Sequence, residues 1–205
     1  GIRVIGLPGT IDNDLGYTDF TIGFDTAVNT VIDAIGKIRD TSESHGRHTV
    51  IEVMGRKCGD IALYAGIASG AEYILLPDAE VDAAAMSRQL LEAKARGKHH
   101  SLIVRAEGAP LSTEEITKII EERTGEECKA VVLGYIQRGG SPTADDRILA
   151  SRTGYHAVEL LKQEGGSRAV GISGNRIIDM DLEEALAIKR KSSPELIAMA
   201  EVLSK

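Results

Sequence analysis

Two carboxylates that could take part in acid–base or metal chemistry lie near the start of the chain, Asp12 and Asp14, separated by Asn13. In an extended loop, residues two positions apart point to the same side, so both carboxylates can share one site. Such a pair can bind a divalent cation, or one carboxylate can accept a proton while the other steers the metal. Aspartate and asparagine also cap helices and form turns, and the spacing alone leaves both interpretations open.

Three arginines lie next to short apolar segments, each of them beside a glycine: Arg47, Arg56 and Arg138. A guanidinium group pairs with phosphate through two parallel hydrogen bonds, and glycine lets backbone amides approach the same anion. One such arginine alone is more typical of a surface salt bridge, but three that converge at one sheet edge favour an anionic substrate. Glu107 ends another apolar segment, where it can bind a polyol or act as the partner of a helix dipole.

Apolar segments alternate with amphipathic ones along the chain, which predicts strands at residues 3–6, 49–54, 73–76, 102–106, 129–133 and 169–172. Helices are expected at 25–39, 61–69, 83–96, 113–123, 144–161 and 182–189, with a last one opening at Ser193 and Pro194. This alternation predicts an α/β fold of parallel, doubly wound sheets with helices on both faces. Ligands bind beyond the carboxyl ends of such strands, in loops here expected at 9–14, 55–60, 107–109, 134–140 and 173–176.

Composition excludes several classes of protein. The 205 residues carry a net charge of -7 and only 3% aromatic residues, which argues against binding to nucleic acid. No apolar run approaches the roughly 18 residues that cross a bilayer, so no membrane partner is expected. The two cysteines, Cys58 and Cys128, form no disulfide framework or CxxC metal site, which indicates a reducing compartment, the cytoplasm.

Five motifs then occur in a fixed order: Pro8–Asp14, Phe20–Ala27, Ile51–Arg56, Val104–Gly108 and Gln137–Thr143. With them the chain resembles the bacterial-type ATP-dependent 6-phosphofructokinase family from end to end. The resemblance implies two Rossmann-like lobes, the first of them incomplete. Residues 1–24 and 137–190 would form the remnant of a nucleotide-side lobe, 25–136 a sugar-phosphate and effector lobe, and 191–205 a C-terminal helix.

The implied activity is a step of glycolysis, phosphoryl transfer from ATP to the 1-hydroxyl of fructose 6-phosphate with Mg²⁺, giving fructose 1,6-bisphosphate. Asp12 matches the family's general base, and Thr10 and Asp14 share its loop near the transferred phosphoryl group and the metal. Asp14 is the one metal ligand expected within this chain. Arg56 matches the arginine that neutralises charge on the moving phosphoryl group.

The resemblance also implies a sugar-phosphate site. Glu107 matches the sugar-binding glutamate and Arg138 a ligand of the 6-phosphate, while Arg47 and Lys129 match ligands supplied across a subunit boundary, which implies a homo-oligomer, usually a tetramer. The family has arginine where Lys129 stands and histidine where Tyr135 stands, so weaker sugar-phosphate affinity is expected. The implied substrate-binding set is Thr10, Ile11, Asp12, Arg47, Met54, Gly55, Arg56, Glu107, Lys129, Tyr135, Ile136, Gln137 and Arg138.

An effector site for ADP or phosphoenolpyruvate is implied as well, at positions that in the family lie between subunits. Its residues are Arg39, Gly70, Ala71, Glu72, Arg96, Lys98, His99 and His100.

The family normally has about one further domain ahead of Gly1, with a GGDGS-like turn that holds ATP and magnesium. The chain is therefore expected to be the carboxyl-terminal portion, lacking the amino-terminal ATP-binding segment and nearly inactive alone. Gly9 stands where pyrophosphate-dependent relatives typically have lysine, which favours ATP. Two alternatives remain open: a pyrophosphate-dependent phosphofructokinase, and a truncated, non-catalytic partner that binds sugar phosphate or effector.

Overall fold

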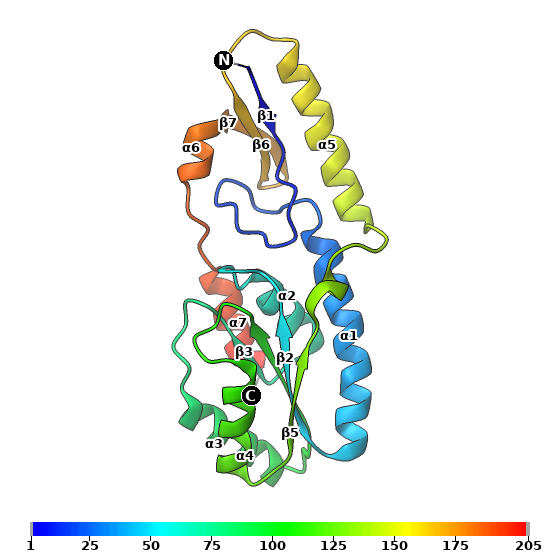
Figure 1. Ribbon diagram of the computed structural model, residues 1–205, viewed down its shortest axis with the longest axis vertical. Helices are drawn as coiled ribbons and strands as arrows, with labels where there is room; N and C mark the ends of the chain where they lie inside the picture. The colour runs from blue at the N-terminus through cyan, green and yellow to red at the C-terminus, as the bar shows by residue number, and fades with distance from the viewer. Residues whose placement is uncertain (1, 204–205) are drawn as a thin grey trace. The chain divides into compact units, whose positions relative to one another are not determined.

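The computed structural model describes residues 2–203, which divide into two compact units (Figure 1). One unit contains the chain up to Ala27 together with Arg138–Lys191, and we call it the three-stranded unit after its sheet. The other contains Val28–Gln137 and the residues from Ser192 onward, and we call it the four-stranded unit. No described helix is both long enough and apolar enough to cross a membrane.

The four-stranded unit is built on a parallel sheet with the strand order β3-β4-β2-β5. Its strands are β2 (His48–Val53), β3 (Tyr73–Leu75), β4 (Ser101–Ala106) and β5 (Cys128–Val132). Its helices are α1 (Phe24–His45), α2 (Asp60–Ser69), α3 (Ala83–Ala95), α4 (Thr113–Thr124) and α7 (Pro194–Leu203), although α1 starts in the other unit. Val53 pairs with Ala106 at the carboxyl ends of β2 and β4, so the segments that follow these strands start side by side.

Helices cover both faces of this sheet, as the sequence predicted. On one face the strands pack against α3 and α4 in a buried cluster that includes Val50, Leu75, Met86, Leu90, Ile103, Ile116, Ile120 and Cys128. Because side chains alternate along a strand, Ile51 and Leu102 point to the opposite face, where α2 packs against β3 and β4. The approach of α2 is close, since a Cβ at Gly66 would lie 2.6 Å from the Ile74 side chain.

The three-stranded unit has a mixed sheet, with β1 (Ile5–Gly6) parallel to β6 (Arg168–Ser173) and β6 antiparallel to β7 (Arg176–Asp181). Its helices are α5 (Ala144–Leu161) and α6 (Leu182–Ala187). The loop expected at 173–176 is a tight hairpin turn between β6 and β7, in which Gly174 and Asn175 have φ of 53° and 64°. A Gly-Asn pair between apolar strands is a hairpin signal, so β7 was missed although the sequence contained its mark.

Most predicted element ends agree with the structure to within one or two residues, and α1 is the largest difference. It continues to His45 through a polar stretch that was expected to lie beyond the helix. The Ser42 hydroxyl donates to the Ile38 carbonyl at 2.8 Å and lies 2.7 Å from the Thr49 hydroxyl, so it is satisfied while the helix continues. A short 3-10 helix, η1 (Gly134–Gln137), also occupies part of the loop expected after β5.

Candidate functional site

The turn after β2 presents Arg56 on a backbone that is unusual for arginine. Gly55 has φ 136° and Arg56 has φ 53°, the left-handed region that side chains other than asparagine and aspartate rarely adopt. A Cβ at position 55 would collide with the Cys58 carbonyl oxygen, so glycine is needed there. The turn is closed by a hydrogen bond of 2.8 Å from the Cys58 N–H to the Gly55 carbonyl.

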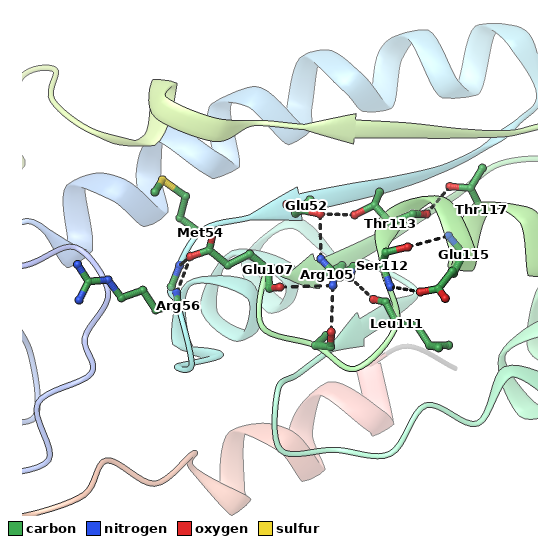
Figure 2. Close-up of polar contacts among 12 residues, drawn as sticks. Glu52, Met54, Arg56, Arg105, Glu107, Leu111, Ser112, Thr113, Glu115 and Thr117 are labelled. Carbon is green, nitrogen blue, oxygen red and sulfur yellow. Dashed lines mark hydrogen bonds and ion pairs between the residues drawn. The ribbon is translucent and has the colours of Figure 1, made fainter.

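Glu107, at the end of β4, holds this turn through its carboxylate. Its Oε1 accepts hydrogen bonds from the backbone N–H of Gly55 at 3.1 Å and of Arg56 at 2.6 Å (Figure 2). None of the described residues donates to Oε2, which leaves that oxygen for a ligand. Figure 2 shows the Arg56 side chain extending away from Glu107, and it is exposed. The structure thus brings these two predicted residues together and gives Glu107 a backbone-holding role that the sequence did not reveal.

Gln137 supports the same turn from η1. Its side chain is only 1% exposed, its Oε1 accepts from the Met54 N–H at 3.0 Å, and its Nε2 donates to the Gly134 carbonyl at 3.0 Å. Tyr135 and Ile136 of the same short helix point outward and are 79% and 59% exposed. Of these three predicted substrate-binding residues, Gln137 therefore uses its side chain to fix the end of β2.

An ion pair between buried Arg105 and partly buried Glu52 lies behind the turn, and sequence reasoning missed it. Arg105 and Glu52 are register partners on β4 and β2, and Arg105 Nη1 donates to Glu52 Oε2 at 2.8 Å. Thr113 donates to the same carboxylate oxygen. The available signal was one charged residue in the interior of each of two otherwise apolar strands, at positions that the parallel register pairs.

Arg47 and Lys129 lie at the amino-terminal ends of β2 and β5, the edge opposite the Arg56 turn. The expectation that Arg47 and Arg56 converge at one sheet edge was wrong within this chain, because β2 runs between them. Both cations pair with Glu127, Lys129 at 2.5 Å and Arg47 at 3.8 Å. The hydrogen bond and charge of Lys129, with the charge of Arg47, lower the pKa of Glu127, so the three residues form one charged cluster.

The loop that carries Asp12 belongs to the three-stranded unit. The Thr10 hydroxyl accepts from the Asp12 N–H at 3.2 Å, and the Ile22 N–H donates to the Pro8 carbonyl at 2.8 Å, so the loop is closed on itself. Asn13 has φ 52°, so the loop is not extended there. The expectation that Asp12 and Asp14 point to the same side rested on an extended loop, so that reason does not hold. Asp12 is 3% exposed, whereas Asp14, like Ile11, is half-buried.

Two residues that sequence reasoning did not single out, Asp146 and Arg190, form hydrogen bonds with backbone groups near this loop. Asp146 accepts from the N–H of Gly23 at 2.7 Å and of Thr26 at 2.8 Å, which caps the start of α1. Arg190 donates to the Thr18 carbonyl at 2.7 Å. The first of these contacts spans 123 residues, so no local pattern predicts it.

Arg138, a predicted ligand of the 6-phosphate, is exposed and starts the second segment of the three-stranded unit.

The Asp14 carboxylate has the chemistry of a magnesium ligand. Mg²⁺ in phosphoryl-transfer sites is usually bound by one or two carboxylates, with substrate phosphates and water completing the shell. Within residues 2–203 no group of three or more histidine, cysteine, aspartate or glutamate side chains is placed to hold a metal by itself. Asp14 is half-buried in a loop, so its carboxylate is chemically suited to contribute one ligand to a shared ion of this kind.

Five of the eight predicted effector residues line one cavity of about 210 Å³ in the four-stranded unit: Gly70, Ala71, Glu72, Arg96 and Lys98. Glu72 is already engaged there, because it pairs with Lys98 and accepts from the Leu102 N–H at 2.6 Å. Arg39 donates to the Ser69 carbonyl beside this cavity. His99 and His100 are not among the described residues that line it.

Comparison with known proteins gives consistent results. The phosphofructokinase family profile matches residues 1–161. The ATP-dependent 6-phosphofructokinases of Alkaliphilus metalliredigens and Clostridium tetani are each 61% identical over 204 residues. A phosphofructokinase structure from Saccharomyces cerevisiae superposes with a TM-score of 0.86 at 34% identity, covering 98% of this chain and 27% of that one. A pyrophosphate-dependent enzyme from Marinobacter aquaeolei shares the fold, with a TM-score of 0.81 at 24% identity over 95% of this chain and 55% of that one.

The matched relatives are longer than this chain. All of the chain aligns with the Alkaliphilus and Clostridium tetani proteins, but it spans only 64% of the length of each.

Proposed function

Because the chain belongs to the phosphofructokinase family, we propose that it transfers a phosphoryl group from ATP to the 1-hydroxyl of fructose 6-phosphate. The observation that carries this proposal is the turn at Gly55 and Arg56, pinned by the Glu107 carboxylate. A strained backbone held by two hydrogen bonds to one carboxylate is typical of a functional site. The names of the two bacterial relatives, which are 61% identical, support ATP as the donor.

The proposed reaction is an in-line displacement at phosphorus. The 1-hydroxyl oxygen bonds to the γ-phosphorus of ATP, the bond from that phosphorus to the bridging oxygen breaks, and ADP leaves with the electron pair. Asp12 accepts the hydroxyl proton, and Arg56 stabilises the negative charge that spreads over the transferred oxygens. Mg²⁺, when bound, neutralises charge on the phosphate oxygens, and Asp14 would be one of its ligands.

The proposed sugar-phosphate site uses Glu107 Oε2 for a sugar hydroxyl and Arg138 for the 6-phosphate. Arg47 and Lys129 would serve the 6-phosphate of a neighbouring subunit in a homo-oligomer, which we propose to be a tetramer. Their position at the sheet edge away from Arg56 supports this assignment, because a ligand held at the Arg56 turn lies beyond the reach of Arg47 in the same chain.

The cavity of about 210 Å³ supports an effector site for ADP or phosphoenolpyruvate, with Arg96 and Lys98 as phosphate ligands. We place the reaction in glycolysis in the cytoplasm, consistent with the named relatives.

The donor decides between this proposal and its alternatives. The chain would be joined to the part of the Alkaliphilus enzyme that it does not match, giving a chimeric enzyme, and product formation from fructose 6-phosphate would be measured with ATP or pyrophosphate. We expect turnover with ATP and almost none with pyrophosphate. Turnover with pyrophosphate alone would establish the pyrophosphate-dependent alternative. No turnover with either donor, but retained binding of fructose 6-phosphate, would establish a non-catalytic binding partner.

A further inference from the structure

We propose that Arg105 is a positioning residue for Arg56, acting through the loop that carries Glu107. This inference rests on the proposed function, in which Arg56 stabilises the transferred phosphoryl group. Arg105 itself contacts no reacting atom in this proposal. Its guanidinium group fixes a loop, the loop fixes a turn, and the turn sets the direction of the Arg56 side chain.

The first link joins Arg105 to the loop between β4 and α4. Arg105 is 5% exposed and donates from Nε to the Leu111 carbonyl at 2.5 Å and from Nη2 to the carbonyls of Ala109 at 2.9 Å and Glu107 at 3.4 Å (Figure 2). Nη1 is held by Glu52. Three of the four acceptors of this guanidinium are carbonyls of the same loop, so its planar fork sets the path of the loop.

The second link joins that loop to the Arg56 turn. The Glu107 N–H donates to the Val53 carbonyl at 2.8 Å, and the Glu107 carboxylate accepts from Gly55 and Arg56. The next residue packs directly against the turn, because a Cβ at Gly108 would collide with the Arg56 carbonyl oxygen. The loop therefore touches the turn through both side-chain and backbone atoms.

The turn depends on this support because its backbone is disfavoured. A left-handed arginine persists only where its surroundings hold it, and the pair of hydrogen bonds from Gly55 and Arg56 to Glu107 is one such restraint. If the loop shifts, the turn relaxes and the Arg56 guanidinium moves from its position. A displacement of about 1 Å at a catalytic group can lower turnover by about a hundredfold.

A kinetic double-mutant cycle in the chimeric enzyme tests this coupling of Arg105 to Arg56 through the loop and the turn, which we call the relay. Arg105→Lys keeps the positive charge, but one ammonium group cannot reach Glu52 and three carbonyls together. We expect Arg105→Lys to lower kcat by about tenfold or more when Arg56 is present, and by less than about twofold in the Arg56→Ala background, where the positioned group is gone. Equal losses in both backgrounds, or kcat within about twofold of the parent in folded Arg105→Lys, would overturn the proposal.

Two further variants distinguish a specific effect on Arg56 from a general loss of folded protein. Arg123→Lys changes an exposed arginine on α4 and is expected to leave kcat within about twofold of the parent. If Arg105→Lys melts below the assay temperature, Gly108→Ala displaces the turn from the exposed side of the loop without removing a buried charge. In the same cycle, Gly108→Ala must then lower kcat more when Arg56 is present than in the Arg56→Ala background. Equal losses of kcat in both backgrounds would reject the proposed coupling from the loop to Arg56.

Amide hydrogen exchange of the chain itself separates this inference from the proposed function. Arg105→Lys, or Gly108→Ala if the former unfolds, should speed exchange at the Gly55 and Arg56 N–H groups by about tenfold, while the Cys128 N–H, bonded to Glu121 on the far edge, keeps its rate. Unchanged exchange at Gly55 and Arg56 would overturn the relay whatever the activity. A chimeric enzyme that lacks turnover while these amides respond would overturn the proposed function alone.

Discussion

At the scale of single residues, the charge cluster at the amino-terminal edge of the sheet shapes the proposed sugar-phosphate site. Arg47 and Lys129 are both paired with Glu127, whose pKa is lowered by the Lys129 hydrogen bond and by both positive charges. An incoming phosphate must share these cations with a carboxylate that is fully ionised at neutral pH. Lysine also presents a single ammonium group rather than a planar fork, so phosphate is expected to bind more weakly here than at a site with two arginines.

Lys129→Arg is expected to lower the KM for fructose 6-phosphate about threefold or more, with little change in kcat, because the fork can bind phosphate and Glu127 together. Steady-state kinetics of the chimeric enzyme measures both constants. Lys118→Arg, at an exposed position on α4, is the matched control. An unchanged KM in Lys129→Arg would mean that this position does not serve the phosphate.

Asp179 gives a pH-dependent prediction on stability. Its pKa is lowered most by the His156 hydrogen bond; burial opposes this shift, and the hydrogen bond and charge of Arg168 add to the lowering. A carboxylate whose folded-state pKa is depressed contributes stability above its ordinary pKa, 3.8, and the contribution is lost as the pH falls through the folded value. Asp179→Asn should therefore lower the free energy of unfolding by about 1–2 kcal/mol at pH 7 and by progressively less as the pH falls below 3.8.

Urea unfolding of both forms across that pH range provides the measurement for Asp179→Asn. Asp145→Asn, in the exposed first turn of α5, serves as the control. An equal loss of stability at both ends of the pH range would show that the ionisation of Asp179 has no part in it.

At the scale of elements, local sequence signals predicted most of the helices and strands, but they could not predict contacts between residues that are distant in the sequence. At the start of α4, Ser112 and Glu115 form a capping box with both of its hydrogen bonds, and their spacing is a local sequence signal for a helix start. Helix and strand periods predicted the parallel sheet, and the loops that contain Arg56 and Glu107 were correctly expected at the carboxyl ends of its strands. The Asp146 cap and the Arg105 network depend on partners far away in sequence, so their roles become visible only in three dimensions.

The capping box supplies an element-scale prediction. Ser112→Ala removes the acceptor for the Glu115 N–H at the start of α4 and should lower the free energy of unfolding by about 1 kcal/mol. Thermal or urea unfolding measures the change. Ser44→Ala, whose hydroxyl bonds only within the end of α1, should change stability by less than about 0.5 kcal/mol. If Ser112→Ala lowers the free energy of unfolding no more than Ser44→Ala does, the capping box does not contribute to stability as proposed.

At the scale of the whole molecule, the proposed roles are divided between the units and between subunits. The proposed general base, Asp12, belongs to the three-stranded unit, whereas Arg56 and Glu107 belong to the four-stranded unit. Arg47 is proposed to serve a neighbouring copy. Activity is therefore expected to be a property of an assembly, since under this proposal each subunit would supply part of the site that its neighbour uses.

Mixed oligomers test this sharing. Asp12→Asn and Arg47→Ala chimeric subunits should each be nearly inactive, but after denaturation and refolding together about a quarter of the sites would combine an intact Asp12 with an intact neighbouring Arg47. Recovery of roughly that fraction of parental activity is expected. Recovery of none, from subunits shown to co-assemble, would mean that Arg47 acts within its own chain.

The most direct test of the central claim is kcat for Asp12→Asn in the chimeric enzyme, with Asp145→Asn as the carboxylate control. Loss of a general base is expected to lower kcat by about 10²–10⁴-fold, with the KM for fructose 6-phosphate changed by less than about threefold, because asparagine keeps the shape but cannot accept the proton. An Asp12→Asn enzyme that turns over as fast as the Asp145→Asn control would contradict the account.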